Sequence, residues 1–298
     1  MQNKKTLAWV ILITLSLVWG SSFILMKRGM VAFSSDEVAA MRISIAFLFL
    51  SPLLIKHYKL DLKKYWLGLI FMGVFGNLIP AFLFTKAETQ ISSGLAGMLN
   101  ALTPLFTIIV SLIWLRDKPS KIKIVGVLIG FLAAISLMLF NDSGETSNNV
   151  IYSLLVVAAT FCYAISINGI KKYLHDLNSV KATVWAFCFT GPVALIYLFG
   201  FSNFTTHLSQ HPEALNSLGY VSILAIFGTA ISVIIYNNLI KLSGVIFASS
   251  CTYLIPVVAV LWGLFDSETI NIIQIISILV IILSVYLINK PPKVDLGV

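Results

Sequence analysis

Polar side chains are scarce within the long apolar runs of this sequence, so the few that occur there are the first candidates for chemistry. In the run 93–115, spacings of 3, 3, 4 and 4 keep a set of small and polar residues on one face of a helix: Gly97, Asn100, Thr103, Thr107 and Ser111. Lipid cannot satisfy the hydrogen bonds of such a face, so we assign Asn100 to a solute pathway. Thr107 and Ser111 instead fit close helix packing, where small hydroxylated residues are common.

Two prolines, Pro104 and Pro256, lie at corresponding places in two apolar runs. Proline removes a backbone hydrogen bond and releases the carbonyl four residues earlier, which is that of Asn100 or of Thr252. Released carbonyls at membrane depth are tolerated where they face protein or water. Both prolines are therefore candidate hinges, and the alternative is a passive kink.

Further aromatic, amide and hydroxyl groups lie away from the ends of the apolar runs. With Arg42 they make up the set that we expect to bind a small molecule: Trp19, Ser22, Arg42, Asn77, Asn100, Tyr163, Tyr236, Asn237 and Tyr253. Tryptophan and tyrosine also anchor helices at the membrane surface. Trp9, Trp66 and Trp185 lie close to the ends of their runs and fit that second role.

Arg42 lies about a turn and a half inside the second apolar run, where burial of its charge is costly. It could bind a substrate carboxylate, pair with Glu88, or extend to the lipid headgroups. Glu88 is the candidate for coupling to protons. Uniport and exchange remain open alternatives, because no acidic or histidine residue lies in the middle third of any run.

The spacing of the cysteine, histidine and acidic residues does not support a catalytic or metal-binding site. The cysteines Cys162, Cys188 and Cys251 lie far apart inside apolar runs, and the four histidines lie in loops or at helix ends. The acidic residues expected outside, Asp142, Glu145, Asp266 and Glu268, resemble solvated loop charges rather than a catalytic cluster. We therefore expect no metal, no cofactor and no enzymatic activity.

The elements that position these residues follow from composition. Of 298 residues, 58% are hydrophobic and 11% charged, and the mean hydropathy is +0.96, which excludes an ordinary soluble domain. A bilayer core needs about 20 apolar residues per helix. Such windows predict an all-α membrane protein with ten transmembrane helices, at 7–26, 37–55, 66–85, 93–115, 122–140, 151–170, 181–200, 215–240, 245–265 and 270–289.

The basic residues predict the orientation. If the N-terminus is cytoplasmic, 16 of the 20 Lys and Arg residues fall in cytoplasmic segments and Arg42 lies within a helix, so only Lys27, Arg28 and Lys86 fall outside. We therefore expect both termini in the cytoplasm and an uncleaved first helix. The net charge of +8 is spread between apolar runs instead of forming one face, which argues against a nucleic-acid partner and for the lipid bilayer.

An internal repeat divides the chain. Ala87–Pro104 can be laid on Leu239–Pro256, 152 residues later, and the first and sixth runs correspond at an offset of 144. An acidic residue follows each proline-containing run, Asp117 in one and Glu268 in the other. Because each half, 1–145 and 146–298, has an odd number of spans, the two must be inverted, as in many secondary transporters.

These features resemble the drug/metabolite transporter superfamily, and specifically its EamA-type ten-helix members. The resemblance covers about residues 7–289 and is carried by Trp19-Gly20-Ser21-Ser22-Phe23, Arg42, Ser92–Ala96, Pro104-Leu105, Asp117, Gly126, Pro256, Glu268 and Gln274. Arg116-Asp117-Lys118 and Ser277 depart from the family pattern and leave the subgroup open.

The resemblance implies a bacterial inner-membrane carrier that exports amino acids or related small metabolites by alternating access. Alternatives are efflux of drug-like cations and, from another class, a membrane-embedded enzyme. Gly126 and Gly130 form a small-residue face that we assign to packing within the chain, so we expect a monomer.

Overall fold

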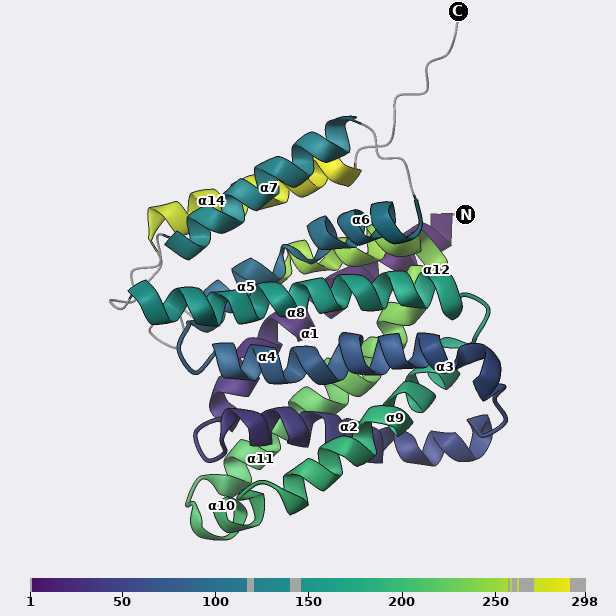
Figure 1. The fold of residues 1–298 in the computed structure, drawn as a ribbon, viewed down its shortest axis with the longest axis vertical. Coiled ribbons are helices and arrows are strands. Elements are labelled where there is room, and N and C mark those ends of the chain that lie inside the picture. Colours follow the sequence, from purple (N-terminus) through teal and green to yellow (C-terminus); the bar gives the residue numbers. More distant parts are fainter. Residues whose placement is uncertain are drawn as a thin grey trace, which may run out of the picture.

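The computed structural model describes residues 2–116, 121–139, 146–256, 258, 262 and 271–289. Every element in these ranges is a helix, and the longer helices lie roughly side by side in one bundle (Figure 1). Within these described residues, seven stretches are long and apolar enough to cross a membrane, and two shorter apolar stretches, Ile124–Ala133 and Ile272–Ser284, accompany them. The all-helical membrane class expected from composition is thus confirmed.

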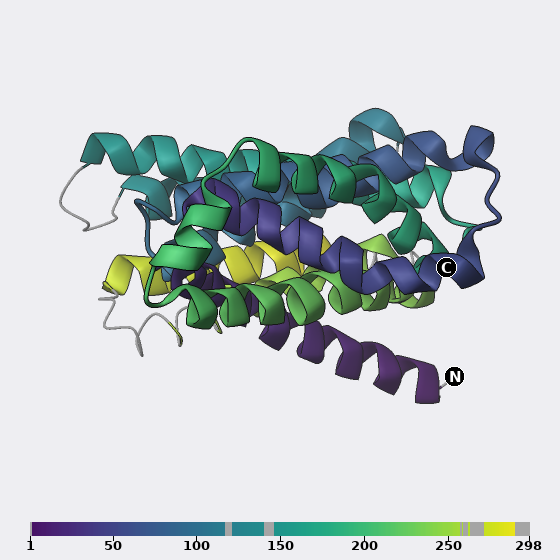
Figure 2. The same cartoon turned by 90° about the horizontal axis from the view of Figure 1, so that it is seen from below.

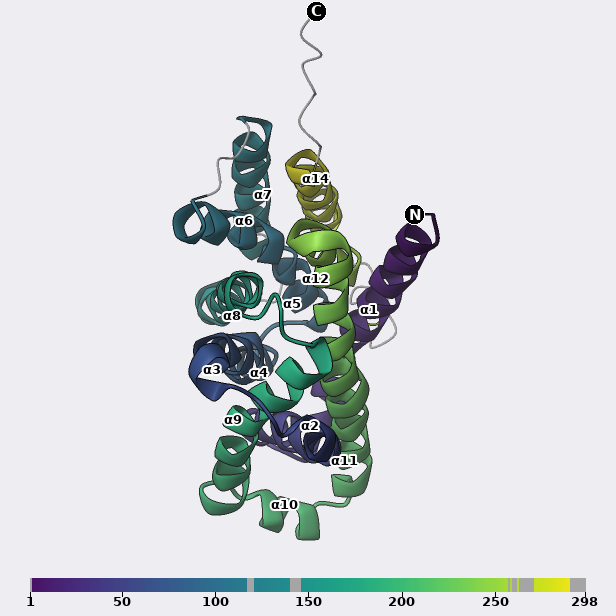
Figure 3. The same cartoon turned by 90° about the vertical axis from the view of Figure 1, so that its right-hand side faces the viewer.

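Four of the long stretches are single helices. They are α1 (Gln2–Gly29), α2 (Ser35–His57), α8 (Thr146–Tyr173) and α9 (Ser179–Gly200). The N-terminal part of α1 projects from the edge of the bundle (Figures 2 and 3), and its apolar side chains, such as those of Trp9 and Val10, are exposed as a lipid-facing surface requires. The start of α9 is fixed by Asn178, whose side chain accepts from two backbone N–H groups.

Two other long stretches change helix type in the middle. The first runs through α3 (Leu62–Ile70), the π-helix η1 (Phe71–Leu78) and α4 (Ile79–Ala87). The second runs through α11 (Ala214–Ile223), the π-helix η2 (Leu224–Ile231) and α12 (Ser232–Ser249). Sequence windows predicted continuous helices at both places. Gly244 interrupts α12 at a φ of 83°, which a glycine adopts without strain, and the chain turns there.

Both proline-containing runs are broken. α5 (Ser93–Asn100) ends before α6 (Thr103–Trp114), which has Pro104 in its first turn. In the later run, the short 3-10 helix η3 (Ser250–Tyr253) precedes Pro256. A proline in the first turn needs no partner for its missing N–H group, so each run restarts its helix at the proline.

The helices α7 (Lys121–Leu139) and α14 (Ile272–Asn289) lie side by side at one end of the molecule (Figures 1 and 3). Gly126 and Gly130 on α7 are buried, and a Cβ atom on Gly130 would lie 2.6 Å from Leu105 Cδ1 and 2.6 Å from Ser284 Oγ. The small-residue face at Gly130 thus packs within the chain.

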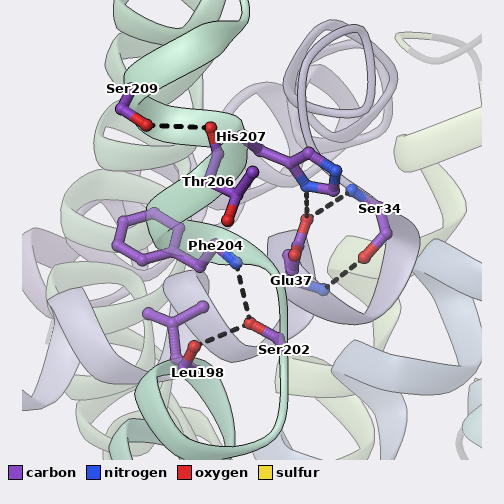
Figure 4. Close-up of polar contacts among 8 residues, drawn as sticks. All are labelled: Ser34, Glu37, Leu198, Ser202, Phe204, Thr206, His207 and Ser209. Atoms are coloured by element: carbon purple, nitrogen blue, oxygen red, sulfur yellow. Dashed lines mark hydrogen bonds and ion pairs between the residues drawn. The ribbon is translucent and has the colours of Figure 1, made fainter.

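A short helix that the sequence did not predict, α10 (Phe204–Gln210), lies at the opposite end of the molecule from α7 and α14 (Figure 1). His207 of α10 contacts the buried carboxylate of Glu37, with Nδ1 and Oε2 2.8 Å apart. The same carboxylate accepts from the Ser34 backbone N–H, and Ser34 Oγ accepts from the Glu37 N–H, a capping box that starts α2 (Figure 4). This network fastens α10 to the first turn of α2.

The expected helix 245–265 is described only in part. Several residues used in the sequence argument lie outside the described residues: Asp117, Lys118, Asp142, Glu145, Asp266 and Glu268.

Candidate functional site

One cavity lies between helices from both parts of the chain. Its empty volume is about 860 Å³, which includes the part that opens to solvent. Eight of the nine residues predicted to bind a small molecule line it: Trp19, Ser22, Arg42, Asn77, Asn100, Tyr163, Tyr236 and Asn237. The structure thus gathers side chains separated by more than two hundred residues in the sequence.

The two π-helices form part of the cavity wall, and each is held by a polar side chain. Asn77 Nδ2 donates to the carbonyl of Met72, five residues earlier, at 2.9 Å. Thr229 Oγ1 donates to the carbonyl of Leu224, also five residues earlier, at 3.3 Å. In both cases the donor contacts the carbonyl five residues earlier, which is the spacing of a π-helical turn.

Trp19 lies in the wall of the cavity. Its Nε1 donates to the Gly228 carbonyl at 2.9 Å, across the seam between α1 and η2. Its ring meets that of Tyr236 edge-on, with centroids 5.0 Å apart. Tyr163, another lining residue, stacks against Phe84, with centroids 5.9 Å apart.

Arg42 has a direct partner that the sequence did not predict. Its Nε donates to Thr229 Oγ1 at 2.7 Å, so a residue of α2 is held by a residue of η2. Its Nη1 lies 3.9 Å from Met26 Sδ. Glu88 and Tyr163 interact with Arg42 electrostatically. The side chain of Arg42 lines the cavity, which favours a role in binding or pairing over extension to the headgroups.

Asn237 is buried deep in the same wall. Its Nδ2 donates to Thr183 Oγ1 at 3.2 Å and lies 3.7 Å from Met72 Sδ. Within the described residues its Oδ1 has no hydrogen-bond partner. An unsatisfied buried acceptor carries a cost, so a small movement of this side chain would let it accept from a ligand.

The broken fourth run brings Asn100 to the cavity, but its carbonyl is already in use. Thr103 Oγ1 donates to that carbonyl at 2.9 Å, which replaces the bond that Pro104 removes. Asn100 therefore offers its side chain rather than its backbone to a ligand. Thr107 Oγ1 donates to the Thr103 carbonyl at 2.8 Å, in line with the packing role predicted for it.

Tyr253 and Glu88 lie outside the cavity lining. Tyr253 is a buried residue of η3. Glu88 is buried directly after α4, where it caps that helix. Pro104 and Pro256, the candidate hinges, are also buried and do not face the cavity.

Sequence reasoning missed Ser166 as a lining residue, together with most of the apolar wall. A signal for Ser166 was present, since it lies 144 residues after Ser22, the offset that relates Trp19 to Tyr163. The apolar lining residues, such as Met72 and Ile255, carry no comparable signal because lipid-facing positions look the same in sequence.

The lining is suited to binding a small molecule. It combines aromatic rings and aliphatic side chains with three asparagine amides and one cation. Among the described residues, no group of three or more His, Cys, Asp or Glu side chains could hold a metal ion. Such a surface fits a small amphipathic molecule.

Comparison with known proteins gives a consistent result along the chain. The EamA-like transporter family matches residues 6–139 and 150–290. A relative in Escherichia coli strain K12, named "Uncharacterized inner membrane transporter YedA", is 28% identical over 285 residues, covering 93% of this chain and 89% of the relative. An "Uncharacterized transporter" of Archaeoglobus fulgidus is 27% identical over 257 residues, covering 86% of this chain and 88% of that protein.

The fold has a counterpart among solved structures as well. A crystal structure aligns with a TM-score of 0.66 over 95% of this chain and 96% of that chain, at 14% identity. At that identity the likeness concerns the fold alone.

Proposed function

Since the chain belongs to the EamA-like transporter family, we propose that this membrane transporter is a secondary carrier that exports small metabolites such as amino acids by alternating access. The observation that carries the proposal is the cavity, because it lies where helices of the two parts of the chain meet and is lined by polar groups of helices long enough to span a membrane. The substrate-binding set is the eight predicted residues that line it.

The proposed architecture is ten spans in two inverted halves, 1–145 and 146–298. Helix pairing supports it. α2 packs on α9 and α7 packs on α14, and each pair joins helices that would occupy the same place in the two halves. Likewise α4 packs on α8 much as α12 packs on α1. The two stretches matched by the family, 6–139 and 150–290, support the same division.

Equivalent close contacts at the two π-helices also support the internal repeat. Phe75-Gly76-Asn77 in η1 and Phe227-Gly228-Thr229 in η2 are related by 152 residues. A Cβ atom on Gly76 would clash with Ser166 Oγ, and one on Gly228 would come within 2.9 Å of Ser22 Oγ. Each half thus presents a glycine to a serine of the other half.

We place the carrier in a bacterial inner membrane with both termini in the cytoplasm. The distribution of Lys and Arg supports this orientation, and the Escherichia coli relative carries the words "inner membrane transporter" in its name. We keep the monomer as part of the proposal, since the small-residue face at Gly130 is occupied within the chain.

Efflux of drug-like cations is the second candidate, but Arg42, the one charged residue among the described residues of the lining, disfavours it because it would repel a cation. For the coupling of transport to protons we retain Glu88, which is buried and interacts electrostatically with Arg42. Protonation of this carboxylate would then accompany transport.

Counterflow in proteoliposomes tests the proposal. Purified full-length protein is reconstituted with unlabelled amino acids inside, and uptake of the labelled compound is followed with and without a pH gradient. We expect transient accumulation of at least one amino acid, and a response to the pH gradient that Glu88→Gln abolishes. Folded protein that accumulates no compound from a broad metabolite panel would reject the carrier role.

A further inference from the structure

Arg42 is the single charged residue among the described residues that line the cavity. A guanidinium has five N–H donors in a fixed plane. The structure gives this one two contacts, a hydrogen bond from Nε to Thr229 Oγ1 and a contact of Nη1 with the weak acceptor Met26 Sδ. Within the described part of the chain, its terminal nitrogens therefore lack an oxygen acceptor.

Thr229 fixes the orientation of this cation. Its hydroxyl proton is directed at the Leu224 carbonyl, so the oxygen must accept from Arg42 Nε. Thr229 is almost completely buried and does not line the cavity, so it holds Arg42 from behind. With Nε occupied, the edge formed by the two terminal nitrogens is the one left for a ligand.

The single positive charge of Arg42 favours a ligand group with a single negative charge. One guanidinium edge matches the two oxygens of one carboxylate, and the pair forms two parallel hydrogen bonds. A phosphate dianion would enter a site of low dielectric with half of its charge unmatched by the lining, which is costly. Glu88 acts on the same cation from outside the lining, so the charge that faces the cavity is positive.

The aromatic residues of the cavity wall indicate the character of the rest of the ligand. The rings of Trp19 and Tyr236 contact each other, and so do those of Phe84 and Tyr163. These four residues all line the cavity. Their faces favour an apolar or aromatic body beside the charged group.

We propose that the group recognised in this cavity is a carboxylate bound by the terminal nitrogens of Arg42, and that Thr229 is the positioning residue that holds Arg42 from the other half of the chain. The inference rests on the carrier role proposed above. It adds the chemical group by which the carrier recognises its substrate. It also makes this recognition depend on a contact between the two halves of the chain.

Matched pairs of acids and amides test it on the full-length protein in proteoliposomes. Suitable pairs are L-phenylalanine with L-phenylalaninamide, L-leucine with L-leucinamide, and 3-phenylpropionate with 3-phenylpropionamide. Counterflow and competition give an apparent affinity for each member. In the wild-type protein we expect the acid to bind roughly tenfold or more tightly than its amide, as the loss of a charge-assisted hydrogen bond implies.

The variants separate recognition from folding. Arg42→Gln is expected to bring the acid-to-amide ratio close to one, and Arg42→Lys to leave an intermediate ratio, because lysine cannot present a planar edge. Thr229→Val should lower the ratio about threefold to tenfold, and Thr229→Ser should restore it. Thr190→Val is the matched control, since Thr190 is a buried threonine whose hydroxyl donates to the Ala186 carbonyl away from the cavity.

The outcomes are distinct. Folded Arg42→Gln or Thr229→Val protein that keeps the wild-type ratio overturns the inference. Wild-type protein that carries amides as well as acids, or carries cations alone, also overturns it and leaves the carrier role standing. Wild-type protein that carries no compound of a broad panel rejects the carrier role and this inference with it.

Discussion

Asn168 is a buried polar residue that joins two helices beside the cavity. Its Nδ2 donates to the Ala164 carbonyl of its own helix at 2.9 Å and to the Thr107 carbonyl of α6 at 3.0 Å. Removal of this amide leaves the Thr107 carbonyl without that donor, so Asn168→Ala should lower the free energy of unfolding by about 1–3 kcal/mol.

The matched variant at the other side of the contact is Thr107→Val. The hydrogen bond from Asn168 uses the backbone carbonyl of Thr107, whereas the Thr107 hydroxyl donates only within α6. We therefore expect Thr107→Val to lower the free energy of unfolding by less than about 1 kcal/mol. Thermal unfolding in detergent compares the two. Equal losses would contradict the account, because they would place the interhelical contact in the threonine hydroxyl.

At the residue scale, the sequence predicted which polar and aromatic residues line the cavity better than it predicted the hydrogen-bond partners of the buried polar side chains. Residues such as Asn100 and Tyr236 stood out because polar and aromatic groups are rare inside apolar runs. The partners of Arg42 and Asn168 could not be predicted, because Thr229 and Thr107 are 187 and 61 residues away in the chain.

At the scale of elements, the close approach of η1 to α8 depends on a glycine. Gly76→Ala would place a Cβ atom against Ser166 Oγ, and overpacking of this kind costs about 1–3 kcal/mol. The double variant Gly76→Ala/Ser166→Ala removes the clashing oxygen, so we expect it to recover most of the loss. Thermal unfolding of the four combinations measures the coupling.

Gly219→Ala provides the control for helix propensity. Gly219 lies in α11 with no other atom within 4 Å of an added Cβ, so its substitution should be neutral or stabilising by up to about 1 kcal/mol. An equal loss at positions 219 and 76 would show that the effect at η1 is not steric.

Most helices could be predicted from the sequence, and the interruptions only in part. Apolar windows located the long runs, and proline marked the breaks at 104 and 256. The π-helices could not be predicted, because the contacts of Asn77 and Thr229 with carbonyls five residues earlier form only in the folded chain. The helix α10 was missed because it is short and polar.

At the scale of the whole molecule, an exposed ion pair joins the two halves at the end expected to face the cytoplasm. Lys64 Nζ of α3 lies 2.5 Å from Asp176 Oδ2, in the segment between α8 and α9, and Tyr65 Oη donates to the same oxygen at 3.0 Å. These donors lower the pKa of Asp176 from its ordinary 3.8 to about 2.

The pH dependence follows from that lowered pKa. Because the folded state favours the ionised carboxylate, the contact stabilises the protein fully above about pH 4, and this stabilisation is lost as the pH falls through about 2. Asp176→Asn should remove that part of the acid sensitivity. Unfolding midpoints measured from pH 5 downward check it, and identical curves for both proteins would contradict the assignment.

The central claim is that one cavity between two inverted halves opens alternately to the two sides of the membrane. The most direct measurement is labelling of Ser166→Cys, in a protein without Cys162, Cys188 and Cys251, by a membrane-impermeant maleimide added from either side of sealed vesicles. We predict reaction from both sides in vesicles that hold their pH gradient, and protection by a transported substrate. Reaction from one side only, or from neither, would contradict the account.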